Sequence, residues 1–74
     1  MTVYTVDFCC NDGSWSGYRQ TQVCLAASYE AGLREGIKYA QTIYPEVTWD
    51  KDNLRHTINF TDVWIRIKEQ GVVR

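Results

Sequence analysis

A single helical segment constrains the fold of this chain more than any other feature of its sequence. Between Ser28 and Pro45, apolar side chains recur at the spacing of an amphipathic helix. These side chains are Tyr29, Leu33, Ile37, Ala40 and Tyr44. Ser28 is a suitable N-cap, and Pro45 ends the helix because the residue before a proline is disfavoured in the helical conformation. With 74 residues, the chain has room for one domain, residues 1–74.

Two glycines, Gly32 and Gly36, lie one turn apart inside this helix, where each costs about 1 kcal/mol relative to alanine. They lie beside the apolar stripe, on the flank that also carries Tyr39. We expect them to let the helix lie close on its own sheet, where they make room for bulky residues such as Trp15 or Trp49. The alternative is a shallow groove at the glycines that accepts a partner, including a second copy of the chain.

The segment before the helix predicts two strands. Residues 3–10 alternate between the two faces of a strand, and an Asp-Gly pair at 12–13 predicts a hairpin turn. The second strand follows over residues 18–26. Alternation along it places Leu25 inward and Cys24 outward.

The segment after the helix predicts a second hairpin. Residues 54–60 and 63–68 each alternate with the period of a strand, with a tight turn expected at 61–62. The residues of the first run that we expect to face inward are Leu54, His56, Ile58 and Phe60. The order strand, strand, helix, strand, strand predicts an α+β fold, an antiparallel four-stranded sheet with the helix packed on one face. The other face is then open to water or to a partner.

The composition argues against several classes of function. The chain has eight basic and nine acidic residues and a net charge of −1, so it lacks both the positive charge of a typical nucleic-acid binder and the negative charge of a nucleic-acid mimic. Its start has no basic segment followed by a long apolar run, and no segment approaches the roughly 20 apolar residues that span a bilayer. We therefore expect a cytoplasmic protein that does not contact a membrane.

Three cysteines and one histidine are the potential metal ligands and nucleophiles. Alternation puts Cys9 and Cys24 on the outward side of their strands. It puts Cys10 and His56 on the inward side, so the four side chains do not converge in the tetrahedral geometry that zinc requires. A catalytic cysteine needs a nearby base, and a lone histidine on an apolar strand face is more often a packed, hydrogen-bonded residue. We expect reduced thiols, no metal, no cofactor and no enzyme activity.

The outward face of the second hairpin carries the strongest candidate for a binding site. It combines an aromatic ring with cationic, amide and hydroxyl side chains: Arg55, Thr57, Asn59, Trp64, Arg66 and Lys68. Tryptophan and arginine dominate the energetics of protein–protein interfaces. The expected partner-binding residues are therefore Trp64, Arg66, Lys68 and Arg55, with Tyr39 and Gly36 on the helix flank as a second candidate surface. The alternatives are a nucleic-acid-binding module, which would stack bases on Trp64 and hold phosphates with the cations, and a homodimer that buries Trp64.

The order of elements resembles that of small accessory proteins carried by phages and other mobile elements. The likeness rests on a hairpin that runs into "AASYEAGLREGIKYA" and on a second hairpin after it. Several compact anti-defence proteins, including some anti-CRISPRs, have a similar plan. The resemblance implies a non-enzymatic protein that binds a host protein or complex and modulates it.

Overall fold

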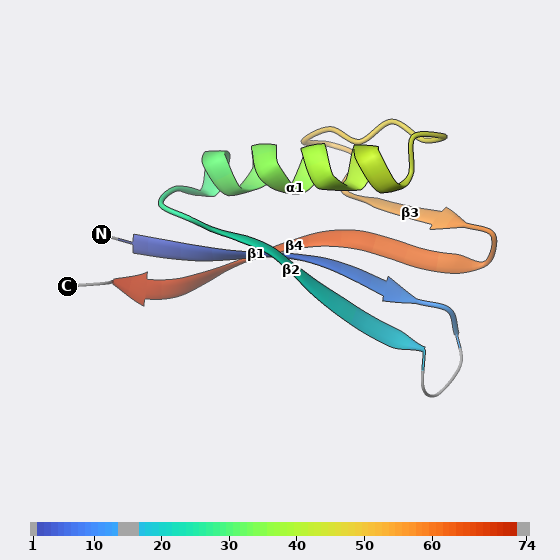
Figure 1. Cartoon of the computed structure of the whole chain (residues 1–74), viewed down its shortest axis with the longest axis horizontal. Coiled ribbons are helices and arrows are strands. Elements are labelled where there is room, and N and C mark those ends of the chain that lie inside the picture. Colours follow the sequence, from blue (N-terminus) through green and yellow to red (C-terminus); the bar gives the residue numbers. More distant parts are fainter. Residues whose placement is uncertain (1, 14–16, 73–74) are drawn as a thin grey trace.

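The computed structural model describes residues 2–13 and 17–72, so the expectation for Trp15 lies outside the described residues. Its elements are β1 (Thr2–Asn11), β2 (Tyr18–Ala26), α1 (Tyr29–Ile43), β3 (Arg55–Ile58) and β4 (Thr61–Val72). The four strands form one antiparallel sheet in the order β2-β1-β4-β3, and α1 lies across one face of it (Figure 1). The predicted α+β fold is confirmed.

The centre of the sheet is built from the first and the last strand. β1 pairs with β4 along its whole length, from Thr2 opposite Val72 to Asn11 opposite Asp62. β2 and β3 are therefore the edge strands, and β3 pairs only with residues 61–64 of β4. The start of β1 and the end of β4 consequently lie side by side at one end of the sheet (Figure 1).

The two glycines of α1 set how closely the helix approaches the sheet. A Cβ atom on Gly32 would lie 2.8 Å from Val6 Cγ2, and one on Gly36 would lie 2.8 Å from Ile65 Cγ2 and 3.1 Å from Val6 Cγ1. Both glycines are buried. The prediction that they seat the helix on its own sheet is confirmed, but their neighbours are β-branched residues of β1 and β4, and Trp49 is not among them.

The start of α1 is capped as the sequence predicts. Ser28 has an extended backbone, and its Oγ accepts a hydrogen bond from the Ala31 N–H at 3.1 Å. This bond satisfies one of the backbone donors that the first turn leaves without a helical partner. The helix ends at Ile43, two residues before Pro45.

An aromatic cluster fills the space between the end of α1 and the sheet. The ring of Phe8 in β1 lies with its centroid 5.7 Å from that of Tyr39, 5.9 Å from Tyr44 and 5.8 Å from Trp49. Phe8 and Trp49 are both buried. Aromatic pairs at these separations add stability beyond the area that they bury. They hold the loop after α1 against the sheet.

The predicted faces of Leu25 and Cys24 are wrong. Cys24 pairs with Val6 and lies on the side of α1, whereas Leu25 pairs with Thr5 on the opposite face and is 63% exposed. The register between β1 and β2 shifts between Val6 and Asp7, so simple alternation does not hold along β2. Small side chains are needed on the helix side at this end, because the helix backbone lies directly above them.

The predicted turn at 61–62 is also wrong, because the β3–β4 turn is formed by Asn59 and Phe60. Ile58 pairs with Thr61, which leaves two residues in the turn, with φ of 51° and 67°. This is the left-handed geometry that tight hairpin turns use. Phe60 is consequently 96% exposed and does not face inward. β4 continues to Val72, beyond the predicted strand over 63–68.

Candidate functional site

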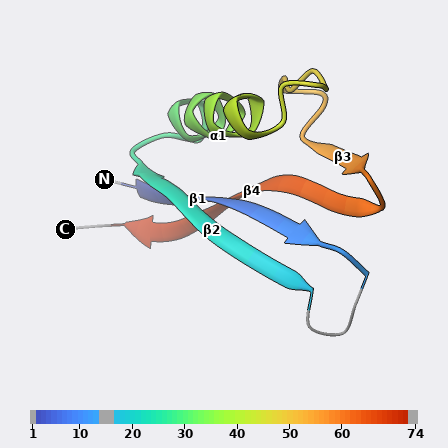
Figure 2. The same cartoon turned by 45° about the vertical axis from the view of Figure 1, so that its right-hand side comes forward.

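The face of the sheet away from α1, called the open face below, carries the predicted partner-binding side chains. Figure 2 shows α1 and the segment between α1 and β3 on the same side of the sheet, opposite to this face. The strand register brings Arg55 opposite Trp64, and Arg66 opposite Asp7. Lys68 lies opposite Thr5, further along the same face. The four residues predicted for this face are therefore neighbours on two adjacent strands.

Trp64 is partly buried because two side chains pack against its ring. The guanidinium carbon of Arg55 lies 5.1 Å from the ring centroid, and the Tyr18 ring of β2 lies at 6.0 Å with an interplanar angle of 47°. A guanidinium within about 6 Å of a tryptophan ring is attracted by the electron density of its face. Trp64 thus forms the middle of a row that runs from β3 to β2.

Arg55 is held over this ring by an ion pair at the end of the hairpin. Its Nε donates to the Asp62 carboxylate at 3.0 and 3.1 Å, and its Nη2 also bonds to that carboxylate. The hydrogen bonds from Arg55 hold the pKa of Asp62 below its ordinary value. The guanidinium of Arg55 is therefore oriented in advance of binding.

Arg66 is likewise held in place by side chains of β1 and β2. Its Nη2 donates to Asp7 Oδ2 at 3.3 Å and to Gln20 Oε1 at 2.7 Å, and its Nη1 donates to the Tyr18 hydroxyl at 3.5 Å. Asp7 is only 2% exposed, and its Oδ1 has no hydrogen-bond partner among the described residues. A buried carboxylate needs a cation beside it, so Arg66 serves the fold as well as the surface.

The end of the sheet that is remote from the β3–β4 turn has an apolar hollow. The hollow, of about 280 Å³, lies where β1 begins and β2 ends, lined by Val3, Leu25, Ala26 and Ala27. Among the described residues that line it, Ala26 and Ala27 have small side chains that leave space beside Leu25. The hollow therefore offers an apolar surface at the end of the sheet that is remote from the β3–β4 turn.

The second candidate surface, Gly36 and Tyr39 on the helix flank, faces the chain itself. Gly36 is buried against Val6 and Ile65, and the Tyr39 ring packs edge-on against Phe8. The groove that the glycines carve is occupied by the chain's own sheet.

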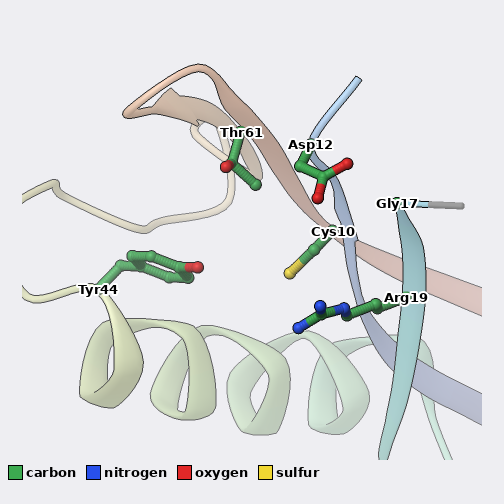
Figure 3. A pocket seen from close by; sticks show the side chains of 6 residues that line it. All are labelled: Cys10, Asp12, Gly17, Arg19, Tyr44 and Thr61. Carbon is green, nitrogen blue, oxygen red and sulfur yellow. The ribbon is translucent and has the colours of Figure 1, made fainter. Parts of the chain in front are cut away.

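A polar pocket of about 200 Å³ lies between the end of α1 and the ends of β1 and β2. It is lined by Cys10, Asp12, Gly17, Arg19, Tyr44 and Thr61. The side chains of Tyr44 and Arg19 point toward the Cys10 thiol from opposite sides (Figure 3). Burial raises the pKa of this thiol, which disfavours its thiolate, the nucleophilic form.

His56 is a packed, hydrogen-bonded residue, as the sequence predicts. Its Nε2 lies 3.0 Å from the Thr48 carbonyl oxygen, and its ring lies edge-on to Trp49 with the centroids 4.5 Å apart. The cysteines at 9, 10 and 24 are all free thiols. Within residues 2–13 and 17–72, no group of three or more histidine, cysteine or acidic side chains is arranged to hold a metal ion.

Several residues at or beside the open face were not among the predicted binding residues. Tyr18 and Asp7 both contact Arg66, and Phe60 projects from the β3–β4 turn. Sequence alternation places Asp7 on the face opposite to Val6, which is the available signal for its position. No sequence signal links Tyr18 to Trp64, because their contact depends on strand order.

Comparisons with known proteins gave no match. No protein-family model, curated protein or solved structure matches the chain. Among the described residues, no helix is both long enough and apolar enough to cross a membrane.

Proposed function

We propose that this chain is a small non-enzymatic protein that binds a host protein or complex through the open face and modulates it. In keeping with its resemblance to accessory proteins of phages and mobile elements, it acts in the cytoplasm of a bacterial host. The observation that carries the proposal is the preorganised row of Arg55, Trp64 and Tyr18, with Arg66 beside it. Tryptophan, tyrosine and arginine are the residues enriched in interface hot spots.

Preorganisation supports binding because it lowers the entropy that association must remove. Long side chains that are immobilised only on binding cost roughly 0.5–1.5 kcal/mol each. Arg55 and Arg66 are already fixed by Asp62 and Asp7, and the Trp64 ring is already held between its neighbours. A protein partner therefore meets a surface that is ordered in advance.

The same ion pairs make protein a better partner than nucleic acid. A phosphate contact needs a cation that is free to replace a counterion. Arg55 and Arg66 each face a carboxylate of their own chain, so contact with phosphate would compete with Asp62 and Asp7. Nucleic acid remains the alternative occupant of the open face and is distinguished by the experiment below.

The test is capture of bacterial proteins by the tagged chain, with and without nuclease, at low and moderate salt. We expect a discrete protein that survives nuclease, is retained at moderate salt, and is lost with Trp64→Ala or Arg66→Glu. Tyr29→Ala and Arg34→Glu, which change an aromatic and a cation of α1, are the matched controls and retain it. Circular dichroism and thermal unfolding establish that each variant is folded.

Two results contradict the proposal. Capture that disappears with nuclease or modest salt assigns the open face to nucleic acid, because phosphate contacts weaken steeply with ionic strength. Capture that is unchanged by both folded open-face variants places the binding surface elsewhere.

A further inference from the structure

β2 is an edge strand, and the first part of it, residues 18–22, is called the β2 edge below. Among the described residues, β2 pairs with β1 on one side and no strand pairs with its other side. All the residues of the β2 edge are exposed. Figure 2 shows this part of β2 at the margin of the sheet, running away from α1. An unpaired edge offers a row of backbone donors and acceptors to another chain.

The register of the sheet determines which backbone groups of β2 face outward. In an antiparallel sheet, the backbone N–H and C=O groups of successive residues point to opposite sides of the strand. The Ile65 N–H donates to the Leu54 carbonyl oxygen at 2.9 Å, so odd-numbered residues in this part of β4 bond toward β3 and even-numbered ones toward β1. The same alternation, followed through β1, directs the backbone groups of Tyr18, Gln20 and Gln22 away from the sheet.

The opposite edge of the sheet has features that discourage strand pairing, and the β2 edge lacks them. β3 pairs with residues 61–64 of β4, so the later part of β4 has no strand beside it on that side within the described chain. That part carries Lys68 and a shift in its register with β1. Lysines, prolines and bulges are the means by which natural sheets avoid pairing at their edges. Residues 18–22 contain no lysine and no proline, and their pairing with β1 has no shift.

The charge on the β2 edge favours an acidic partner strand. Arg19 is exposed, and it belongs to neither ion pair found among the described residues, Arg55–Asp62 and Arg66–Asp7. Opposite charges on neighbouring strands stabilise their pairing. β2 itself contains no acidic residue, so a second copy that paired through the same strand would offer Arg19 no carboxylate. Charge complementarity therefore favours an acidic segment of another protein.

We infer that the β2 edge binds an extended segment of another protein as an added strand of the sheet, with an acidic side chain of that segment beside Arg19. In this mode of recognition, backbone hydrogen bonds supply affinity and alternate side chains supply specificity. The side chains of Tyr18 and Gln20 contact Arg66 on the open face, so the added strand would extend that face. The inference rests on the proposed function in one respect, because it assigns the segment to the host protein that the open face binds.

The first test is amide hydrogen exchange of the free chain, measured by NMR. We expect the N–H groups of Tyr18, Gln20 and Gln22 to exchange rapidly and those of Arg19 and Thr21 to be protected, because only the latter two bond to β1. Equal rates at all five positions, or the opposite pattern, overturn the inference. Protection of the outward groups that grows with protein concentration also overturns it, because the edge then pairs with a second copy.

The second test is selection of binders to the purified chain from a display library of random peptides. We expect extended peptides with one fixed aspartate or glutamate. Gln20→Pro removes the N–H at the middle of the β2 edge, where proline is tolerated because the N–H faces solvent. It is expected to weaken peptide binding by about tenfold, the effect of one lost hydrogen bond. Gln20→Ala is the matched control, because it removes the same side chain, including its bond to Arg66, and keeps the N–H.

Modified peptides give a test that does not depend on the folding of a variant. Methyl groups on the backbone nitrogens of every second residue remove the donors on one side of the peptide strand. Of the two alternate sets, one should abolish binding and the other should retain it. Equal binding of the two methylated peptides overturns strand addition, and so does a selection that yields no peptide.

Charge reversal tests the acidic side chain of the segment. Repeating the selection with Arg19→Glu should replace the fixed acidic residue of the peptides by lysine or arginine. Arg34→Glu, on α1, is the matched control and should leave the acidic preference unchanged. An acidic preference that survives Arg19→Glu overturns the contact with Arg19.

Capture of the host protein by the same variants separates this inference from the proposed function. Capture that survives Gln20→Pro but is lost with Trp64→Ala overturns the inference and supports the proposed function. Capture that is lost with Gln20→Pro, yet retained by Gln20→Ala and Trp64→Ala, supports the inference and contradicts the role of the open face. Loss with both Gln20→Pro and Trp64→Ala, with Gln20→Ala unaffected, supports both.

Discussion

The side chains on the two faces of the sheet are positioned by different interactions. On the covered face, the backbone of α1 touches the methyl groups of Val6 and Ile65, and the fit depends on shape. On the open face, side chains are positioned by hydrogen bonds and ion pairs, as with Arg66 and Asp7. Close packing tolerates added volume poorly, whereas an ion pair is sensitive to loss of one partner in proportion to how deeply the other partner is buried. The comparison indicates that one face is ordered by the fit of its shapes and the other by polar contacts between its side chains.

The largest effect is expected from Gly36→Val, which tests the covered face. A Cβ atom there would lie 2.8 Å from Ile65 Cγ2, and the added methyl groups need further space. We expect a loss of about 3 kcal/mol in the free energy of unfolding, measured by urea denaturation. Glu35→Val is the matched control, because it puts the same β-branched residue at an exposed helix position. Equal losses for the two variants would mean that the helix is not seated through its glycine.

A smaller loss is expected from Arg66→Ala, which tests whether the open face also contributes to the fold. The substitution leaves the Asp7 carboxylate, 2% exposed, without its ion-pair partner. The comparison variant is Arg55→Ala, whose partner Asp62 has a side chain that is 31% exposed and can be hydrated. We expect the urea midpoint of Arg66→Ala to fall below that of Arg55→Ala. The opposite order would show that Arg66 is purely a surface residue.

A gain in stability is expected from Phe60→Gly. Glycine adopts positive φ without the steric penalty that the Phe60 backbone carries. The expected gain is about 1 kcal/mol in the free energy of unfolding of the monomer. Phe60→Ala is the control, because it removes the ring and keeps the Cβ that causes the strain. Thermal unfolding at a concentration where both are monomeric compares them, and an equal response of the two would contradict the strain argument.

The smallest effect is expected from pH, through Asp62 and Asp50. Hydrogen bonds from Arg55 lower the pKa of Asp62, and the backbone N–H of Asp52 lowers that of Asp50, both from an ordinary value of 3.8. A folded-state pKa below the unfolded one adds stability above pH 3.8, which is lost as the pH falls through the folded value. Urea midpoints should therefore be constant near neutral pH and fall in acid. Asp62→Asn should reduce the acid-dependent part.

Much of the fold follows from local patterns in the sequence. The helix between Ser28 and Pro45 and its cap depend on residues close together in the chain, and the spacing of Gly32 and Gly36 within it is also a local signal. The positions of Leu25 and Phe60 could not be predicted in this way. Leu25 takes its face from the register with β1, and Phe60 takes its place from a two-residue turn that glycine usually occupies.

The candidate site also combines features that local sequence patterns predict with features that they do not. Alternation along one strand is sufficient to place Trp64, Arg66 and Lys68 on one face. The partners of these residues are determined by strand order, because Asp7 and Tyr18 reach Arg66 only when β1 lies between β2 and β4. Whether an arginine is free or paired is therefore a property of the tertiary structure.

The pairing of β1 with β4 also affects the order in which the elements fold. β1, β2 and α1 are consecutive in the chain, so they can come together early through contacts between near neighbours. The sheet surface on which α1 packs is incomplete until β4 pairs with β1, because Ile65 of β4 forms part of that surface. Joining residues 7 and 66 closes a long loop, and such distant pairings slow folding. During synthesis, the nascent chain therefore exposes one long edge of β1 until its final strand docks.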